Sequence, residues 1–136
     1  MVYLKALTCL LFAFVVAAAS TGPASAAGGR VTINSGEEVL LHGYMGYRPI
    51  DCKSFNMDVK VVKHPKHGKL RQVVTMVDPA KGYGGGFHSN RCHGTKVSTK
   101  LFYYRAPKGF KGTVQIVLRP VGFQGGRKQR FYVTVK

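Results

Sequence analysis

The chain has 136 residues, and its 21 Lys and Arg against 5 Asp and Glu give a formal net charge of +16 at pH 7. After subtraction of an export signal, which is predicted below, the remaining length has room for one domain with a modest core and excludes a second domain. So strong a positive charge disfavours cationic partners and favours anionic ones: envelope polysaccharide, lipid headgroups or nucleic acid.

The first 26 residues have the three regions of a secretory signal peptide. Lys5 supplies the charge, Ala6–Ala19 is apolar, and Ala24–Ala26 provides small residues before a cleavage point. The apolar run is shorter than the roughly 20 residues that cross a bilayer as a helix. We therefore expect residues 1–26 to be removed, leaving one basic domain, residues 27–136, that is periplasmic or secreted. Because Lys5 leaves with the signal, 20 Lys and Arg remain against 5 Asp and Glu, a formal +15.

Seven short runs between Gly and Pro residues predict β-strands, and no part of the mature domain has a helical period. In chain order the predicted strands are Arg30–Ile33, Val39–His42, Phe55–Lys63, Lys69–Val77, Lys100–Arg105, Thr113–Arg119 and Gln129–Lys136. The last two are the clearest, because apolar residues face one way and polar residues the other, as in a sheet with one face in water. Seven short strands in about 110 residues predict an all-β, two-sheet sandwich.

The alternation also predicts which side chains form the core and where the chain turns. The expected core residues are Val59, Val61, Val74, Val114, Ile116, Leu118, Phe131, Val133 and Val135. The segments His64–Gly68 and Pro107–Gly109 have the composition of tight turns, and each predicts a hairpin. Two stretches, Gly43–Asp51 and Asp78–Gly94, are not predicted as strands, and the second is longer than most connections in compact domains.

Cys52 and Cys92 are the only cysteines of the mature domain. An even pair in an exported chain predicts a disulfide, which would close a loop of roughly 40 residues. On the loop-entropy model such a crosslink stabilises the fold by about 3 to 4 kcal/mol. Two free thiols are the alternative.

The run Val61–Leu70 followed by Phe102–Gly112 resembles the tandem cadherin-like or immunoglobulin-like repeats of bacterial surface proteins, over roughly residues 59–136. Those repeats typically read Pro-x-x-Gly-x-Leu, then Tyr-x-Pro-x-x-Gly-Phe-x-Gly, then a closing strand. The resemblance implies an immunoglobulin-like sandwich used for binding or scaffolding. The acidic residues that can serve calcium in such repeats are absent after Gly112, so no calcium site is predicted.

Each cysteine lies in, or at the end of, an aromatic and glycine-rich loop, Gly43–Cys52 and Gly82–Gly94. A disulfide would bring both loops to one edge of the sandwich, where aromatic faces could stack on sugars or bases beside cationic groups. The candidate ligand-binding residues are Tyr44, Tyr47, Arg48, Tyr83, Phe87, Arg91 and His93. The alternative is that the tyrosines cover the core and the glycines only build turns.

Two further classes of function are weaker alternatives. A periplasmic copper- or zinc-binding protein would use the imidazoles of His42, His64, His67, His88 and His93, but their spacing matches no closed zinc pattern. A small hydrolase would need a carboxylate pair or the neighbours Cys92 and His93, whose side chains point to opposite sides of an extended chain. We therefore predict no catalytic residue, no metal and no cofactor. The expected function is a non-enzymatic binding or structural domain for anionic polymers.

Overall fold

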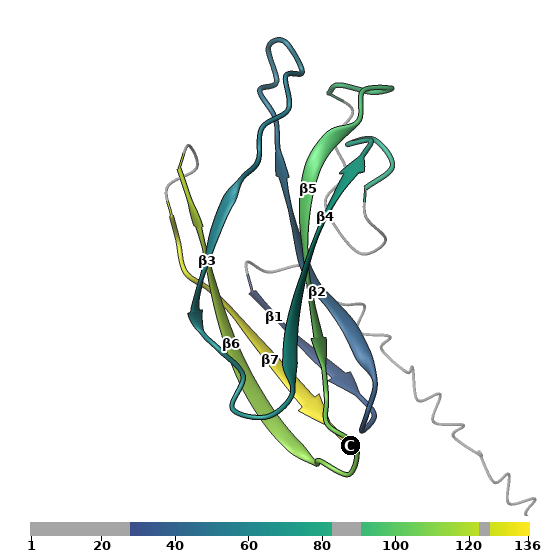
Figure 1. Ribbon diagram of the computed structural model, residues 1–136, viewed down its shortest axis with the longest axis vertical. Helices are drawn as coiled ribbons and strands as arrows, with labels where there is room; N and C mark the ends of the chain where they lie inside the picture. Colours follow the sequence, from purple (N-terminus) through teal and green to yellow (C-terminus); the bar gives the residue numbers. More distant parts are fainter. Residues whose placement is uncertain (1–27, 83–90, 123–125) are drawn as a thin grey trace, which may run out of the picture.

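A computed structural model describes residues 28–82, 91–122 and 126–136, and this part of the chain is all β, with seven strands in two facing sheets (Figure 1). The strands are β1 (Gly28–Ile33), β2 (Glu38–Gly46), β3 (Asp58–Lys63), β4 (Lys69–Val77), β5 (Val97–Arg105), β6 (Gly112–Val121) and β7 (Gln129–Val135). Sheet A has the order β1-β7-β6-β3, and sheet B has the order β2-β5-β4. The seven predicted strands are confirmed. The predicted signal peptide lies outside the described residues.

The β6 and β7 pair supplies one side of the core. Val114 and Ile116 of β6 lie opposite Val133 and Phe131 of β7 in the antiparallel register, and all four side chains are buried. Sheet B supplies the other side through β5, whose Phe102 and Tyr104 belong to the same cluster. The strict alternation of β6 and β7 follows from this arrangement, because one face meets the core and the other meets water.

Seven of the nine predicted core residues are buried, and two differ. Val61 is only half-buried, and Val74 is 53% exposed, so its prediction was wrong. Val74 lies on β4, an edge strand of sheet B, which has a neighbouring strand on one side only. The predicted list also lacked Phe102 and Tyr104, the largest of the fully buried side chains.

Both predicted hairpins were wrong. The connection after β3, which contains His64–Gly68, leads from sheet A to sheet B, and the connection after β5, which contains Pro107–Gly109, leads from sheet B back to sheet A. Antiparallel neighbours that are consecutive in the chain are instead β4 with β5 and β6 with β7. We call residues 64–68 the first crossing and residues 106–111 the second crossing; the β1–β2 and β2–β3 connections also change sheet. The first and second crossings lie together at the lower end of the molecule in Figure 1.

Strand β2 continues into the segment that was predicted to be irregular, since it includes Gly43 to Gly46. The glycine at its end is required by close packing, because a Cβ on Gly46 would lie 2.0 Å from the carbonyl oxygen of Phe55. A larger residue there would push apart two chain segments that run side by side. Within the described residues, no helix is long and apolar enough to cross a membrane.

Candidate functional site

The disulfide between Cys52 and Cys92 is confirmed, with a Cα–Cα distance of 5.5 Å. It joins the connection after β2 to the connection before β5, and both lie at the upper end of the molecule in Figure 1. Both cysteines adopt a left-handed backbone, with φ of 55° and 61°, which residues other than glycine seldom do. The two loops named in the sequence analysis are therefore joined at tightly turned positions.

Tyr44, one of the seven candidate ligand-binding residues, is a core residue. Its side chain is 6% exposed, its hydroxyl donates a hydrogen bond to Oε1 of Gln129, and its ring meets Phe102 edge-on at 5.9 Å. A ring enclosed in this way has no face to offer a ligand. For Tyr44 the alternative stated above, that the tyrosines cover the core, is the one the structure supports.

The other members of that candidate set divide into two groups. Tyr47 is half-buried and forms an isolated β-bridge with Ser54, while Arg48, Arg91 and His93 are exposed. Arg48 pairs with the carboxylate of Asp51 in its own loop. The remaining two candidates, Tyr83 and Phe87, lie outside the described residues.

Asp78 fastens the base of the long connection between β4 and β5. Its carboxylate accepts hydrogen bonds from the backbone amides of Ala80 at 2.9 Å and Gly94 at 3.1 Å. These bonds to the charged form, the first above all, hold the pKa of Asp78 below its ordinary value. The carboxylate therefore holds the two ends of this connection together.

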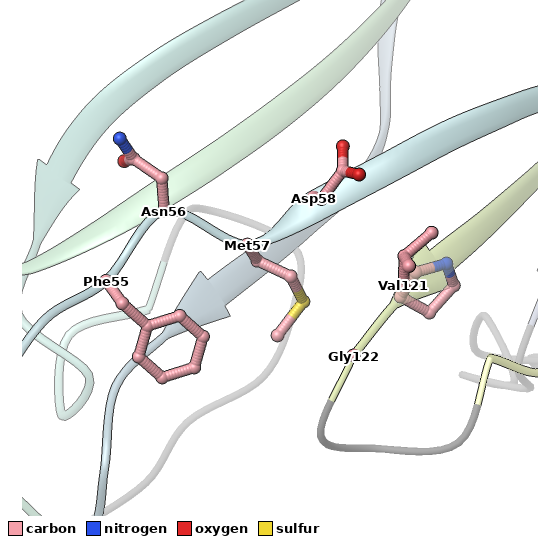
Figure 2. A pocket seen from close by; sticks show the side chains of 7 residues that line it. Phe55, Asn56, Met57, Asp58, Val121 and Gly122 are labelled. Atoms are coloured by element: carbon pink, nitrogen blue, oxygen red, sulfur yellow. The ribbon is translucent and has the colours of Figure 1, made fainter.

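A shallow apolar hollow lies beside this end of the molecule, with a volume of about 240 Å³. Figure 2 shows Phe55 and Met57 extending to the same side of the chain, while the carboxylate of Asp58 points away from them. Val121 closes the hollow from β6 and is 39% exposed. Asn56 and Asp58 are also among the lining residues, so the hollow is mainly but not entirely apolar.

The outer face of sheet A is strongly basic. Alternation places the core residues of its four strands inward, so the intervening residues face water. In β3 the register shifts between Val61 and Lys63, which brings Lys63 to the same outer side as Gln115. Five exposed cations belong to this surface, which we call the cationic face: Arg30, Lys60, Lys63, Arg119 and Arg130. Lys60 and Arg119 are direct register partners across β3 and β6. Like charges in opposite positions destabilise a strand pair, so this pairing costs stability in the free protein.

A line of side chains crosses the cationic face from one edge of sheet A to the other. Lys63 Nζ donates to Oε1 of Gln115 at 2.6 Å, and Gln115 Nε2 donates to the hydroxyl of Tyr132 at 3.0 Å. The guanidinium of Arg30 lies 5.2 Å from the centre of the Tyr132 ring. The line links all four strands and holds the outermost cations in defined positions.

Four of the five Asp and Glu side chains lie away from this face. Glu38, on sheet B, accepts hydrogen bonds from Arg71 at 2.8 Å and Arg105 at 2.9 Å. Three others lie in connections between strands: Glu37, Asp51 and Asp78. Asp58 is the one carboxylate on sheet A, at the first position of β3. The positive charge of the cationic face is therefore nearly uncompensated.

The histidines do not gather into a metal site in the part of the chain that the structure describes. Within it, no three His, Cys, Asp or Glu side chains come close enough together to hold an ion. His42 lies on the inward side of sheet B, 4.7 Å from the Tyr44 ring, while His67 stacks on Phe110 where the first and second crossings meet. His88 lies outside the described residues. The geometry described here lends the metal-binding alternative no support.

Comparisons with known proteins add little to this geometry. No protein-family model matches the chain, and no curated protein matches it. Among solved structures, the solution structure of Amebosin is similar, with 16% sequence identity and a TM-score of 0.44, covering 79% of this chain and 89% of that chain. A similarity at this level carries no argument about fold or function.

Sequence reasoning missed the cationic face as a site, although the signal was present. The polar sides of Thr113–Arg119 and Gln129–Lys136 already predict a face in water, and both contain arginine. The pattern could not show that β1 and β3 extend this face at its two edges, because the alternation of apolar and polar residues does not predict the order of strands in a sheet.

Proposed function

We propose that this chain is an exported, non-enzymatic binding domain with an immunoglobulin-like sandwich, which holds an extended anionic polymer against the cationic face. The observation that carries the proposal is the collection of five exposed cations on one side of sheet A, with Asp58 alone opposing them. The wider chain is equally one-sided in charge, at a formal +15 after removal of Lys5.

The driving force is electrostatic. A polyanion laid across the face would neutralise several cations at once, and each polymer charge that is neutralised releases a condensed counterion. It would also relieve the repulsion between Lys60 and Arg119, which the fold otherwise tolerates at a cost. Adjacent strands are about 4.8 Å apart, so four strands present a surface roughly 15 Å wide, suited to an extended chain.

The shape of the face favours a polymer recognised by its charge. Tyr132 is the aromatic residue on the described part of this surface, and its ring already lies beside Arg30. Proteins that bind single-stranded nucleic acid by stacking use several exposed rings along the strand. An anionic polysaccharide needs no such series of rings, so it is the partner class that this face fits best.

The experiment compares two triple variants for binding to immobilised heparin. R30Q/R119Q/R130Q removes three charges from the cationic face, and K69Q/K96Q/K108Q removes three exposed charges elsewhere. We expect the first to weaken binding by at least roughly tenfold and to reduce the slope of log affinity against log salt by about three, whereas the second has a much smaller effect. Equal losses in the two variants would leave only a diffuse basic surface and overturn the proposal.

A further inference from the structure

A second hollow, of about 380 Å³, lies at the end of the molecule opposite the disulfide, where the first and second crossings meet. Three lysines line it: Lys63 from β3, Lys66 from the first crossing and Lys111 from the second. No carboxylate is among the residues that line it. We call this the lysine hollow.

The three lysines that line the hollow carry like charges, and no carboxylate among the lining residues offsets them. One of them is held in place, because Nζ of Lys63 donates to Oε1 of Gln115 at 2.6 Å. Gln115 is itself fixed by Tyr132 at 3.0 Å. The hollow therefore has a positioned cation at its border with the cationic face, and an anion placed there would be attracted by all three lysines.

The wall formed by the first crossing is fastened to the core. The buried Tyr104 hydroxyl donates to the backbone carbonyl of His67 at 2.9 Å, and the His67 ring stacks on Phe110 with centroids 4.6 Å apart. The next residue, Gly68, has φ of 90°, and a Cβ there would lie 2.4 Å from the carbonyl oxygen of Arg105. These contacts join the two crossings, so the hollow exists before a ligand arrives and little ordering is needed on binding.

We infer that the lysine hollow binds a phosphomonoester group carried by the anionic polymer. This inference rests on the proposed function, since Lys63 belongs both to the hollow and to the cationic face. A phosphomonoester is close to a dianion at neutral pH and has three terminal oxygens, which match three ammonium donors. A phosphodiester has one negative charge and is esterified on two sides, so fewer of its oxygens can accept hydrogen bonds from the three lysines. The face thus holds the length of the polymer, and the hollow holds a phosphorylated unit.

The test is an NMR titration of the full mature protein with glycerol 3-phosphate, and separately with dimethyl phosphate and with sulfate. We expect saturable shifts of backbone amides from Lys111 to Gln115, with glycerol 3-phosphate binding at least about tenfold more tightly than dimethyl phosphate. K66Q and K111Q should each weaken this binding severalfold. K96Q is the matched control, since Lys96 is exposed, lies in the connection before β5 and belongs neither to the hollow nor to the cationic face. Equal affinity for the monoester and the diester, or an equal loss in K96Q, would overturn the inference.

A shape variant tests the hollow without changing its charge. Gly112 lines the hollow with φ of 143°, and a Cβ there would lie 3.3 Å from the Phe110 ring. G112A should therefore weaken glycerol 3-phosphate binding while a folded amide spectrum is retained. Should this variant lose its fold, K66Q and K111Q still decide the question, because both residues are exposed and their loss leaves the core intact.

The same variants separate this inference from the proposed function. If K66Q/K111Q binds heparin with little loss but the wild-type protein shows no saturable shift with glycerol 3-phosphate, the hollow is refuted and the cationic face stands. If glycerol 3-phosphate binds but R30Q/R119Q/R130Q leaves heparin binding unchanged, the proposed function fails, and the hollow is a small-anion site that serves another purpose.

Discussion

The outer faces of the two sheets use the same side-chain types in opposite ways. On sheet A the guanidinium of Arg30 lies 5.2 Å from the Tyr132 ring, and on sheet B that of Arg71 lies 4.5 Å from the Tyr103 ring. On sheet B, Glu38 lies between Arg71 and Arg105 and binds both, whereas Arg30 forms no ion pair with any carboxylate in the described part of the chain. The Arg71–Tyr103 pair is therefore neutralised by an acid, whereas the Arg30–Tyr132 pair keeps its positive charge and belongs to the surface that we propose for binding.

Reversing charge on one face should produce the largest effect. R30E/R119E/R130E turns three attractive groups into repulsive ones, and we expect heparin affinity to fall on the order of 100-fold or more at low salt. The matched variant K69E/K96E/K108E changes net charge by the same amount away from the face. Affinities measured at two salt concentrations check the expectation, and comparable losses in both variants would erase the distinction between the faces.

Removing the acid from sheet B should make that face more like sheet A. Glu38→Gln frees Arg71 and Arg105, so we expect heparin affinity to rise roughly threefold. Glu37→Gln is the control, because the neighbouring Glu37 binds Asn34 in the β1–β2 turn and touches neither arginine. A gain of the same size in both variants would show that net charge alone is responsible.

The ion pairs of Glu38 also predict how the stability of the fold depends on pH. Hydrogen bonds from Arg71 and then Arg105 lower the pKa of Glu38 from its ordinary 4.5. Its folded-state pKa is below its unfolded value, so its contribution to stability is present above about pH 4.5 and is lost as pH falls through the folded-state pKa. Denaturation midpoints measured between about pH 5 and pH 3 should therefore fall more steeply in the wild-type protein than in Glu38→Gln.

A smaller effect is expected from the tyrosine hydroxyls. Tyr132→Phe removes the group that accepts a hydrogen bond from Gln115 at 3.0 Å, which loosens the line across the cationic face, and we expect heparin affinity to fall by about twofold. Tyr103→Phe, the counterpart on sheet B, should leave binding unchanged. Titration calorimetry with heparin measures the affinity of both variants. A larger loss of affinity in Tyr103→Phe than in Tyr132→Phe would contradict the assignment of binding to sheet A.

The smallest effect on binding should come from a substitution of His42, which lies on the inward side of sheet B. Burial lowers the pKa of His42 from its ordinary 6.5, so protonation disfavours the folded state. Its folded-state pKa is below its unfolded value, so the stability present above pH 6.5 is lost as pH falls below 6.5 toward the folded-state pKa. His42→Leu should flatten this pH dependence in urea denaturation and leave heparin affinity unchanged. A change in affinity would mean that core and face are coupled.

The local pattern predicted the strands well because alternation reports directly on which side of a strand meets the core. The run Lys69–Val77 is predicted and observed with identical bounds. The disulfide was also predicted, because Cys52 and Cys92 are the only two cysteines that follow the predicted signal peptide.

Strand order and exposure at the edges could not be predicted in the same way. The Pro and Gly residues of His64–Gly68 reverse the chain whether the next strand pairs with the last one or joins the opposite sheet, so their chemistry fits both a hairpin and a crossing. Tyr44 and Val74 show the same limit: one is enclosed by Phe102 of its own sheet and by Gln129 of sheet A, and the other is exposed at an edge. Both outcomes depend on neighbours distant in the sequence.

The parallel pairing of β1 with β7 has a consequence for how the chain acquires its structure. The register joins Gly28 to Arg130 and Ile33 to Val135, so the first strand is completed only by the last. Until residues 129–135 are present, β1 has no partner strand and β6 lacks one of its two neighbours. Contacts this distant in sequence form slowly. Sheet A is therefore completed late in folding, by contacts between its first and last strands.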